Sequence, residues 1–161
     1  MPAAGPATVP FVDLPRFMGD WYVIANIPTF LEKESFAATE SYRQEQDGTI
    51  ATVFTQRKGS FDAPVKRYTP RAFIRDNTNN AVWGMQFIWP IKAEYLIAYL
   101  NDDYTQAIIA RSRRDYVWVL ARTPQIAEGD LAALSERIRN LGYDMSKLRR
   151  IPQPAAADAT P

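Results

Sequence analysis

The side chains that most often carry out catalysis are scarce in this sequence. Its 161 residues include no histidine and no cysteine, so an imidazole base, a thiol nucleophile and the usual axial ligand of haem are all missing. Serines and carboxylates remain, but no Gly-x-Ser-x-Gly elbow, glycine-rich phosphate loop or metal-ligand spacing occurs. The residue types favour a binding protein with no cofactor and no metal over an enzyme. An enzyme that works through carboxylates stays open as the alternative.

Charge and hydropathy argue against further classes of function. The formal net charge is +1, which offers no broad basic field for nucleic acid. No apolar run approaches the roughly 20 residues that cross a bilayer, and the sequence lacks a signal-peptide pattern. Without cysteine it also lacks disulfides and an N-terminal cysteine for lipid attachment. We expect one soluble domain.

The pattern of apolar residues predicts an antiparallel sheet. Between Asp20 and Arg122 the dominant period is two, and turn-forming residues such as Asp47-Gly48 recur about every ten residues. We expect eight strands, which run approximately over 20–28, 36–46, 49–58, 65–75, 81–88, 94–101, 104–111 and 115–122. Strands joined in this way expose two edges unless the sheet closes. The predicted fold is therefore all-β, an eight-stranded antiparallel up-and-down barrel that can hold one small ligand.

One helix and a short final strand are expected after the sheet. Beyond Pro124 an apolar stripe with helical spacing appears, formed by Leu131, Leu134, Ile138 and Leu141. Asp130 is the predicted N-cap and Gly142 the predicted C-terminal stop. The helix is expected to pack outside the barrel, and "MSKLRRIP" is expected to form a strand. Residues 1–10 and 154–161 are rich in proline and alanine and are predicted to be flexible tails around a domain over 11–153.

Three short motifs resemble those of the lipocalin family. Gly19-Asp20-Trp21 is similar to the first, Asp102-Asp103-Tyr104 to the second, and Arg122 in "VWVLARTP" to the third. "DYVWVLARTP" and "GYDMSKLRRIP" most resemble bacterial outer-membrane lipocalins related to apolipoprotein D. The resemblance covers about residues 11–153. It implies a monomer or homodimer in the periplasm or outer membrane that binds a fatty acid, lysophospholipid or similar lipid without catalysis, in envelope lipid storage or maintenance. Those proteins are typically anchored through a cysteine that this sequence lacks.

The resemblance also implies which residues close the barrel. In the family a tryptophan plugs the closed end and an arginine packs over it. This gives a structural lid rather than a ligand-binding or catalytic group, and its members here are Gly19, Trp21, Asp103, Tyr104 and Arg122.

Strand alternation, combined with the family's register, predicts an apolar and aromatic wall with Glu40 as its one carboxylate. The predicted ligand-binding residues are Ala38, Glu40, Tyr42, Thr52, Phe54, Trp83, Met85, Phe87, Tyr95, Ile97, Tyr99, Gln106, Ile108, Tyr116 and Trp118. The other inward-facing residues are Val23, Ala25, Ile27, Phe36, Ile50, Gln56, Ala110 and Leu120. Two alternatives stay open: these side chains fill the barrel as a core, or Glu40 reaches solvent through a different register or near the rim.

Consecutive hairpin loops alternate between the two ends of the barrel, an alternation that we call hairpin parity, so the loops of each end can be told apart. The second, fourth and sixth loops are polar or acidic, whereas the first, third, fifth and seventh surround the opening and are apolar and basic. The predicted rim consists of Phe30, Leu31, Phe61, Trp89, Ile91, Arg113 and Arg114. Such a rim suits contact with an anionic membrane surface. The alternatives are aromatic side chains that fold inward as loop anchors, or a dimer contact.

Overall fold

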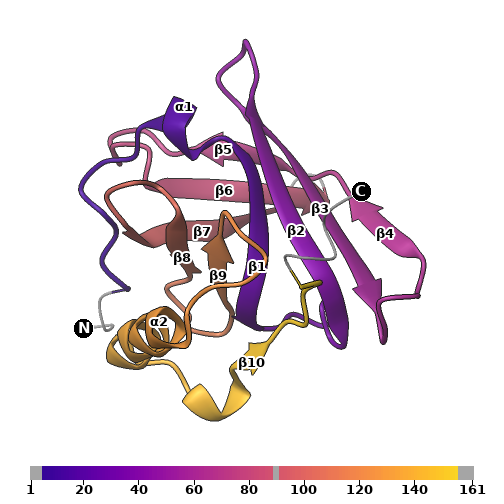
Figure 1. Ribbon diagram of the computed structural model, residues 1–161. Helices are drawn as coiled ribbons and strands as arrows, with labels where there is room; N and C mark the ends of the chain where they lie inside the picture. The colour runs from indigo at the N-terminus through magenta and orange to yellow at the C-terminus, as the bar shows by residue number, and fades with distance from the viewer. Residues whose placement is uncertain (1–4, 89–90, 156–161) are drawn as a thin grey trace.

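A sheet that closes on itself forms the body of the molecule (Figure 1). The computed structural model describes residues 5–88 and 91–155. The strands around the barrel are β1 (Gly19–Ile27), β2 (Ser35–Gln44), β3 (Ile50–Lys58), β4 (Val65–Tyr68), β5 (Arg71–Ile74), β6 (Val82–Ile88), β7 (Ile91–Leu100), β8 (Gln106–Ala110) and β9 (Val117–Ala121). Neighbouring strands around the barrel pair antiparallel, with β4 and β5 both paired to β3, and β9 pairs back with β1. The predicted eight-stranded antiparallel barrel is confirmed.

The fourth predicted strand is divided in two. Both β4 and β5 pair with β3 in the same register, and they are separated by Thr69 and Pro70. Proline has no N–H to donate, so it interrupts the ladder without changing the pairing. The carbonyl of Pro70 still accepts a hydrogen bond from Thr52 N at 3.1 Å. Together β4 and β5 therefore complete one of the eight strands.

A short helix that the sequence did not reveal covers one end of the barrel. Helix α1 (Leu14–Phe17) precedes β1 and buries Leu14 and Phe17. The Phe17 ring lies 5.1 Å from the Trp21 ring, centroid to centroid. Apolar side chains missed as core residues, including Val12, belong to the same interior cluster. This end is the closed end of the barrel.

The second helix packs on the outside, as predicted. Helix α2 (Glu128–Asn140) buries Leu131, Leu134 and Ile138 against the outer surfaces of β1, β8 and β9. Its N-cap is Ala127, so the prediction of Asp130 is wrong. The helix begins earlier, and Asp130 sits in its first turn, where a carboxylate complements the helix dipole. Gly142 follows the helix at φ +98°, as expected for a stop. At 13 residues, α2 is too short to cross a membrane, and no other helix in the described chain is long and apolar enough.

Seven residues predicted to face inward lie on the outer surface of the barrel. Ala25 and Ile27 of β1, Tyr99 of β7, and Ile108 and Ala110 of β8 pack in the cluster under α2. Gln106 donates a hydrogen bond to Asp130 of α2, and Phe36 pairs with Arg57 on the outer face of β3. For β1, β2 and β7 the physical reason is a register shift, between Val23 and Ala25, between Phe36 and Thr39, and between Ile97 and Tyr99. A bulge of this kind puts the residues on its two sides out of phase, so alternation counted from one side assigns the other side to the wrong face. Strand β8 has no shift of its own, and its consecutive apolar residues do not indicate which face lies inside.

Both ends of the described chain contact the barrel. Val9 N donates to Ile97 O at 3.0 Å. At the other end, the 3₁₀-helix η1 (Met145–Lys147) leads into β10 (Arg149–Arg150), which pairs with β1, so only two of the eight residues of the final predicted strand form one. The Gln153 side-chain amide donates to Val23 O at 2.8 Å and to Ala38 O at 2.9 Å. It thereby connects β1 and β2 beside the register shift in each strand. The domain limits and flexible tails stay a prediction.

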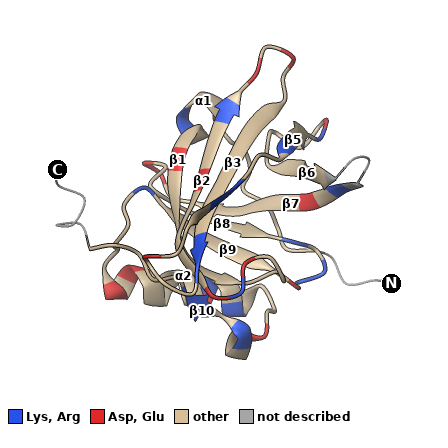
Figure 2. Cartoon of the chain, turned by 90° about the vertical axis from the view of Figure 1, so that its right-hand side faces the viewer, with Lys and Arg blue, Asp and Glu red and all other residues tan. Residues whose placement is uncertain are grey.

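Acidic residues are sparse within the strands (Figure 2). Strands β1, β2 and β7 carry Asp20, Glu40 and Glu94, and the other described strands carry none. Asp20 is exposed and Glu94 is half-buried, whereas Glu40 is buried with 9% of its surface exposed. The sheet therefore brings one carboxyl group of its own into the interior.

Candidate functional site

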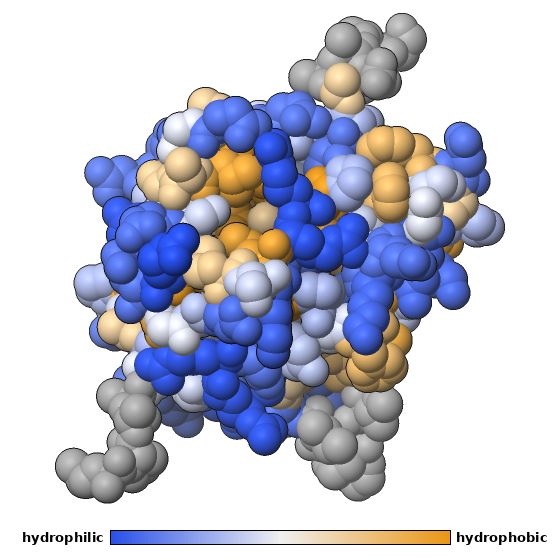
Figure 3. All heavy atoms as spheres, turned by 90° about the horizontal axis from the view of Figure 1, so that it is seen from below, coloured by the Kyte–Doolittle hydropathy of each residue, from blue (hydrophilic) through white to orange (hydrophobic). Residues whose placement is uncertain are grey.

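A cavity of about 310 Å³ opens at the end of the barrel opposite α1. Viewed from that side, apolar side chains gather in the middle of the face and hydrophilic ones surround them (Figure 3). Strand β1 ends there at Ile27, which pairs with Val117 at the start of β9. The loops around this opening are therefore those that hairpin parity predicts.

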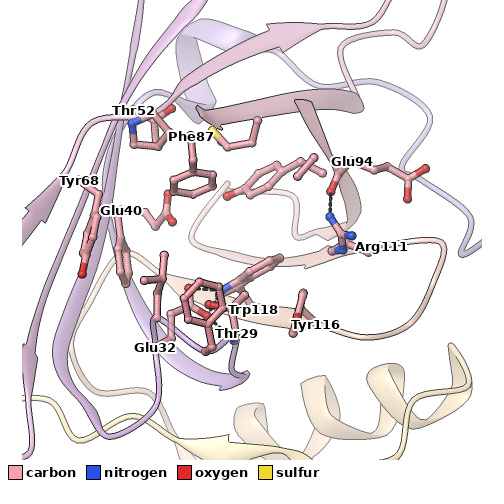
Figure 4. A pocket seen from close by; sticks show the side chains of 17 residues that line it. Thr29, Glu32, Glu40, Thr52, Tyr68, Phe87, Glu94, Arg111, Tyr116 and Trp118 are labelled. Atoms are coloured by element: carbon pink, nitrogen blue, oxygen red, sulfur yellow. Dashed lines mark hydrogen bonds between the residues drawn. The ribbon is translucent and has the colours of Figure 1, made fainter. Parts of the chain in front are cut away.

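The cavity lining includes eight of the residues predicted to bind ligand (Figure 4). They are Glu40, Thr52, Phe54, Met85, Phe87, Tyr95, Tyr116 and Trp118. Phe30 and Leu31 of the predicted rim also line it. Seven lining residues were not predicted: Thr29, Glu32, Tyr68, Pro70, Ala93, Glu94 and Arg111.

Four predicted ligand-binding residues are buried in the barrel without lining the cavity. Ala38, Tyr42, Trp83 and Ile97 are buried inside the barrel, as alternation predicts, but none of them lines the cavity. The Phe17 ring of α1 stacks on Tyr42 at 5.4 Å and meets Trp83 edge-on at 5.6 Å. We call this packed part of the interior the closed half and the part that holds the cavity the open half. The side chains of Tyr99, Gln106 and Ile108 lie on the outer surface of the barrel, as described above, and do not enter either half of its interior.

The five predicted lid residues meet at the closed end. The Arg122 guanidinium carbon lies 3.8 Å from the Trp21 ring centroid. Its N–H groups donate to four backbone carbonyls, those of Arg16, Phe17, Asp20 and Tyr104. The Tyr104 hydroxyl accepts from Asp13 N, the Asp103 carboxylate accepts from Thr105, and Gly19 takes a positive φ of 96° beside Arg122. A planar guanidinium that stacks and donates in several directions suits this position better than an ammonium.

Glu40 points into the cavity from β2. Its Oε2 atom is buried without a hydrogen-bond partner among the described residues. Burial raises the pKa of the Glu40 carboxyl to about 8, and repulsion from Glu32 adds to the shift, while a hydrogen bond with Tyr42 opposes it. The hydroxyl groups of Tyr42 and Tyr95 are hydrogen-bonded to each other. Glu40 is therefore mainly protonated at neutral pH.

Glu32 is the second buried carboxyl group of the cavity. It accepts hydrogen bonds from Trp118 Nε1 at 3.0 Å and from Thr29 N at 3.1 Å. Burial raises the pKa of the Glu32 carboxyl, and these hydrogen bonds oppose the shift. Glu32 lies in the β1–β2 loop, where no strand periodicity indicates which way a side chain points. The sequence therefore carried no signal that could have found it.

A basic side chain stands at the mouth. Arg111 Nε donates to Asp115 Oδ1 at 2.8 Å, and Nη1 donates to the Glu94 carbonyl at 3.1 Å (Figure 4). Its guanidinium carbon lies 5.6 Å from the Tyr116 ring centroid. No group of three acidic residues among those described is arranged to hold a metal ion. The cavity is thus an apolar chamber with two carboxyl groups inside and an ion pair at its entrance.

The predicted rim is partly exposed. Phe30 and Phe61 show 76% and 44% of their surface, and Phe61 also meets Phe36 edge-on. Arg113 is exposed, whereas Arg114 donates to Leu141 O at the end of α2. Trp89 lies outside the described residues, and only the backbone of Ile91 is described.

Comparison with known proteins decides the family. A family model of the lipocalin-like domain matches residues 12–153. The chain belongs to the lipocalin family. Lipocalins generally bind small hydrophobic ligands and are generally not catalysts, which agrees with an apolar cavity at one end of the barrel.

Similar proteins cover most of this lipocalin. Temperature-induced lipocalin-1 of Arabidopsis thaliana is 30% identical over 88% of this chain and 80% of its own length. Outer membrane lipoprotein Blc of Escherichia coli K12 is 25% identical over 96% and 87%. Apolipoprotein D of Bos taurus is 22% identical over 84% and 74%. The predicted resemblance to outer-membrane lipocalins and apolipoprotein D is confirmed.

Solved structures share the fold of this lipocalin at low identity. Apocrustacyanin C2 superimposes with a TM-score of 0.70 at 10% identity, covering 98% of this chain and 94% of its own. Insecticyanin from the tobacco hornworm Manduca sexta gives 0.68 at 16% identity, covering 98% and 89%. These likenesses concern the barrel and not the contents of its cavity.

Proposed function

We propose that this lipocalin binds one small hydrophobic or amphiphilic molecule in the cavity and carries it unchanged. The observation that supports the proposal is the apolar chamber of about 310 Å³, open at one end and lined by Phe54, Met85, Tyr95 and Trp118. Ligand pockets are typically about 300–1,000 Å³, so this one accommodates a single ligand. The candidate ligands are a fatty acid, a lysophospholipid or a lipid of similar shape, whose apolar chain would lie against these side chains.

Organic extraction of the purified protein, followed by mass spectrometry, tests this proposal. We expect an amphiphile to copurify and to be recovered unchanged. Ala93→Phe adds a ring inside the cavity and should abolish copurification. Ala51→Phe makes the same change on a β3 residue that does not line the cavity, and should leave copurification intact. Equal recovery from both variants would contradict binding in the cavity.

The alternative is an enzyme that uses carboxylates. The observation in its favour is Glu40, because a carboxyl group with a pKa of about 8 suits proton transfer near neutral pH. No serine lines the cavity among the described residues, and the hydroxyl groups there belong to threonines and tyrosines. Progressive conversion of a candidate substrate, lost in Glu40→Gln, would support the enzyme over the carrier.

We also propose that the rim contacts an anionic membrane surface. Four of the five large apolar side chains most exposed in the described chain lie near the open end: Phe30, Phe61, Val65 and Phe87. Apolar contact and a basic loop together give such docking. Wild-type protein should sediment with anionic vesicles, most strongly at low salt, and Phe30→Ser/Phe61→Ser and Arg113→Glu should each reduce this. If neutral and anionic vesicles both fail to bind, the rim is an entrance or a contact in a homodimer, which sedimentation velocity would reveal.

The proposed place of action is the periplasm or outer membrane, in storage or maintenance of envelope lipid. Its support is similarity to proteins named outer membrane lipoprotein. Fractionation of the source cells, followed by immunodetection, should find the protein with the envelope. Detection in the cytosol alone would contradict this proposal and leave the carrier proposal standing.

A further inference from the structure

The carboxyl group of Glu40 is incompletely satisfied at the inner end of the cavity. Tyr42, which neighbours it on the inner face of β2, bonds to Tyr95, and this hydroxyl pair forms the boundary with the closed half. Glu40 Oε2 is buried and has no partner among the described residues. A buried polar atom without a hydrogen bond destabilises the protein. This atom is therefore available to a ligand that supplies a donor.

No positive charge of the protein compensates the two buried carboxyl groups. Neither Glu32 nor Glu40 forms an ion pair with any described Lys or Arg. Arg111 is the one basic residue among those described in the lining, and its guanidinium is occupied by Asp115 and by the Glu94 carbonyl. The interior of the cavity is thus an acidic site that lacks a cation.

Aromatic rings stand beside these carboxyl groups. Trp118, whose Nε1 donates to Glu32, stacks on Tyr95 with ring centroids 5.9 Å apart. Phe54, which pairs with Glu40 across the β2–β3 ladder, stacks on Tyr68 at 5.7 Å. Ring faces attract cations, and the attraction grows when water is excluded. Carboxyl groups flanked by aromatic faces are the surroundings that suit an alkylammonium group.

We propose that the cavity selects an apolar molecule whose buried end carries a protonated amine, held by Glu40 and Glu32. The proposal rests on the proposed function, because it names the ligand class of the same cavity. An ammonium N–H donates to Glu40 Oε2, and the apolar body extends along Phe54, Met85 and Trp118 toward the mouth. A hydroxyl group supplies the hydrogen bond without the charge and binds more weakly.

Ligands of other classes satisfy the two buried carboxyl groups less well. A carboxylate directed inward finds no basic side chain to pair with among the described residues of the interior, and it is repelled by Glu32 and Glu40 whenever these are ionised. A fatty acid bound with its methyl end inward covers Glu40 Oε2 with hydrocarbon and leaves it unpaired. The arrangement therefore discriminates through repulsion as well as attraction.

Binding of the amine is coupled to loss of a proton. In the empty cavity the pKa of about 8 keeps Glu40 mainly neutral at pH 7, and a bound ammonium favours its carboxylate. One proton then leaves Glu40 for solvent for each amine bound, so affinity should rise between pH 6 and pH 8. The titratable and charged groups around Glu40 are Glu32 from the β1–β2 loop, Tyr42 of β2, Tyr68 of β4 and Tyr95 of β7, with Glu94, Arg111, Asp115 and Tyr116 nearer the mouth.

Three ligands with the same chain and different ends test the proposal. Decylamine, decanol and decanoate are titrated at pH 7 into the protein by calorimetry, after removal of copurified lipid. We expect decylamine to bind best, decanol about tenfold more weakly, and decanoate weakest. Glu40→Gln should lower decylamine affinity roughly tenfold to a hundredfold and change decanol affinity less than threefold. Glu45→Gln, the same change at the closed-end hairpin, should alter neither.

The outcomes separate this proposal from the broader one. Decanoate binding as tightly as decylamine, or decylamine affinity that is flat from pH 6 to pH 8 in wild type, would overturn amine selection while the carrier proposal stands. If none of the three ligands binds, both proposals fail. Retained decanol binding shows that Glu40→Gln is folded, and Glu32→Gln gives an independent second variant.

Discussion

The two halves of this barrel are built from the same strands but treat polar groups in opposite ways. In the closed half, Arg122 is half-exposed and satisfied by four backbone carbonyls and the face of Trp21. In the open half, Glu40 is more deeply buried and keeps an unpartnered oxygen. A polar group whose hydrogen bonds are satisfied stabilises the fold, whereas a buried polar atom without a partner can accept a hydrogen bond from a ligand. The comparison assigns stability to one half and recognition to the other.

The largest expected effect lies in the open half and depends on pH. The folded-state pKa of Glu40, about 8, exceeds its ordinary value of 4.5. The folded protein therefore binds this proton more tightly, and the free energy of unfolding falls as pH rises from about 4.5 to about 8, by up to about 5 kcal/mol from Glu40. Urea unfolding of Glu40→Gln should show a smaller fall over this window than wild type. An unchanged pH profile would mean that Glu40 is not buried as described.

The next effect tests the closed half. Trp21→Ala removes a fully buried ring that packs on Phe17 and Arg122, and should lower the free energy of unfolding by about 3–5 kcal/mol. Ligand affinity of the folded fraction should stay the same, since Trp21 does not line the cavity. Thermal unfolding and decanol titration check both statements. Wild-type stability combined with lost affinity would reverse the roles of the two halves.

A smaller effect is expected from the outer layer of the lid. Arg122→Lys keeps the charge but cannot stack or donate in the same four directions, so we expect a loss of about 1–2 kcal/mol. Chemical denaturation measures this loss. The matched change Arg43→Lys, at an exposed ion pair with Glu45, should cost less than about 0.5 kcal/mol. Equal losses at both positions would remove Arg122 from the lid.

The smallest effect is expected at the rim. Phe30 exposes 76% of its surface, so Phe30→Ser should change the free energy of unfolding by no more than about 0.5 kcal/mol. The same variant should reduce sedimentation with anionic vesicles if the rim docks on membranes. A large loss of stability would instead show that this loop holds the barrel together.

The sequence was most informative where local chemistry determines the structure. Asp47-Gly48 marks its hairpin, and Trp21 and Arg122 mark the lid. Alternation failed where strands are covered on both faces: in "QAIIA" of β8 the apolar residues are consecutive, so no polar residue indicates which face lies inside. Register shifts after Val23 and Ile97 then turned later residues to the outer surface. Glu32 entered the cavity from a loop, where periodicity gives no information.

Gln153 sets a limit on how far the chain can be shortened. Its side-chain amide donates hydrogen bonds to carbonyl oxygens of two strands, those of Val23 on β1 and Ala38 on β2. Gln153 itself lies beyond β10, the last strand. A protein that ends after helix α2 would retain the barrel strands β1 to β9 but would lose the two hydrogen bonds through which Gln153 connects β1 and β2. Expression designs, fusions and crystallisation variants should therefore keep the polypeptide through residue 153 and attach any tag or partner beyond it.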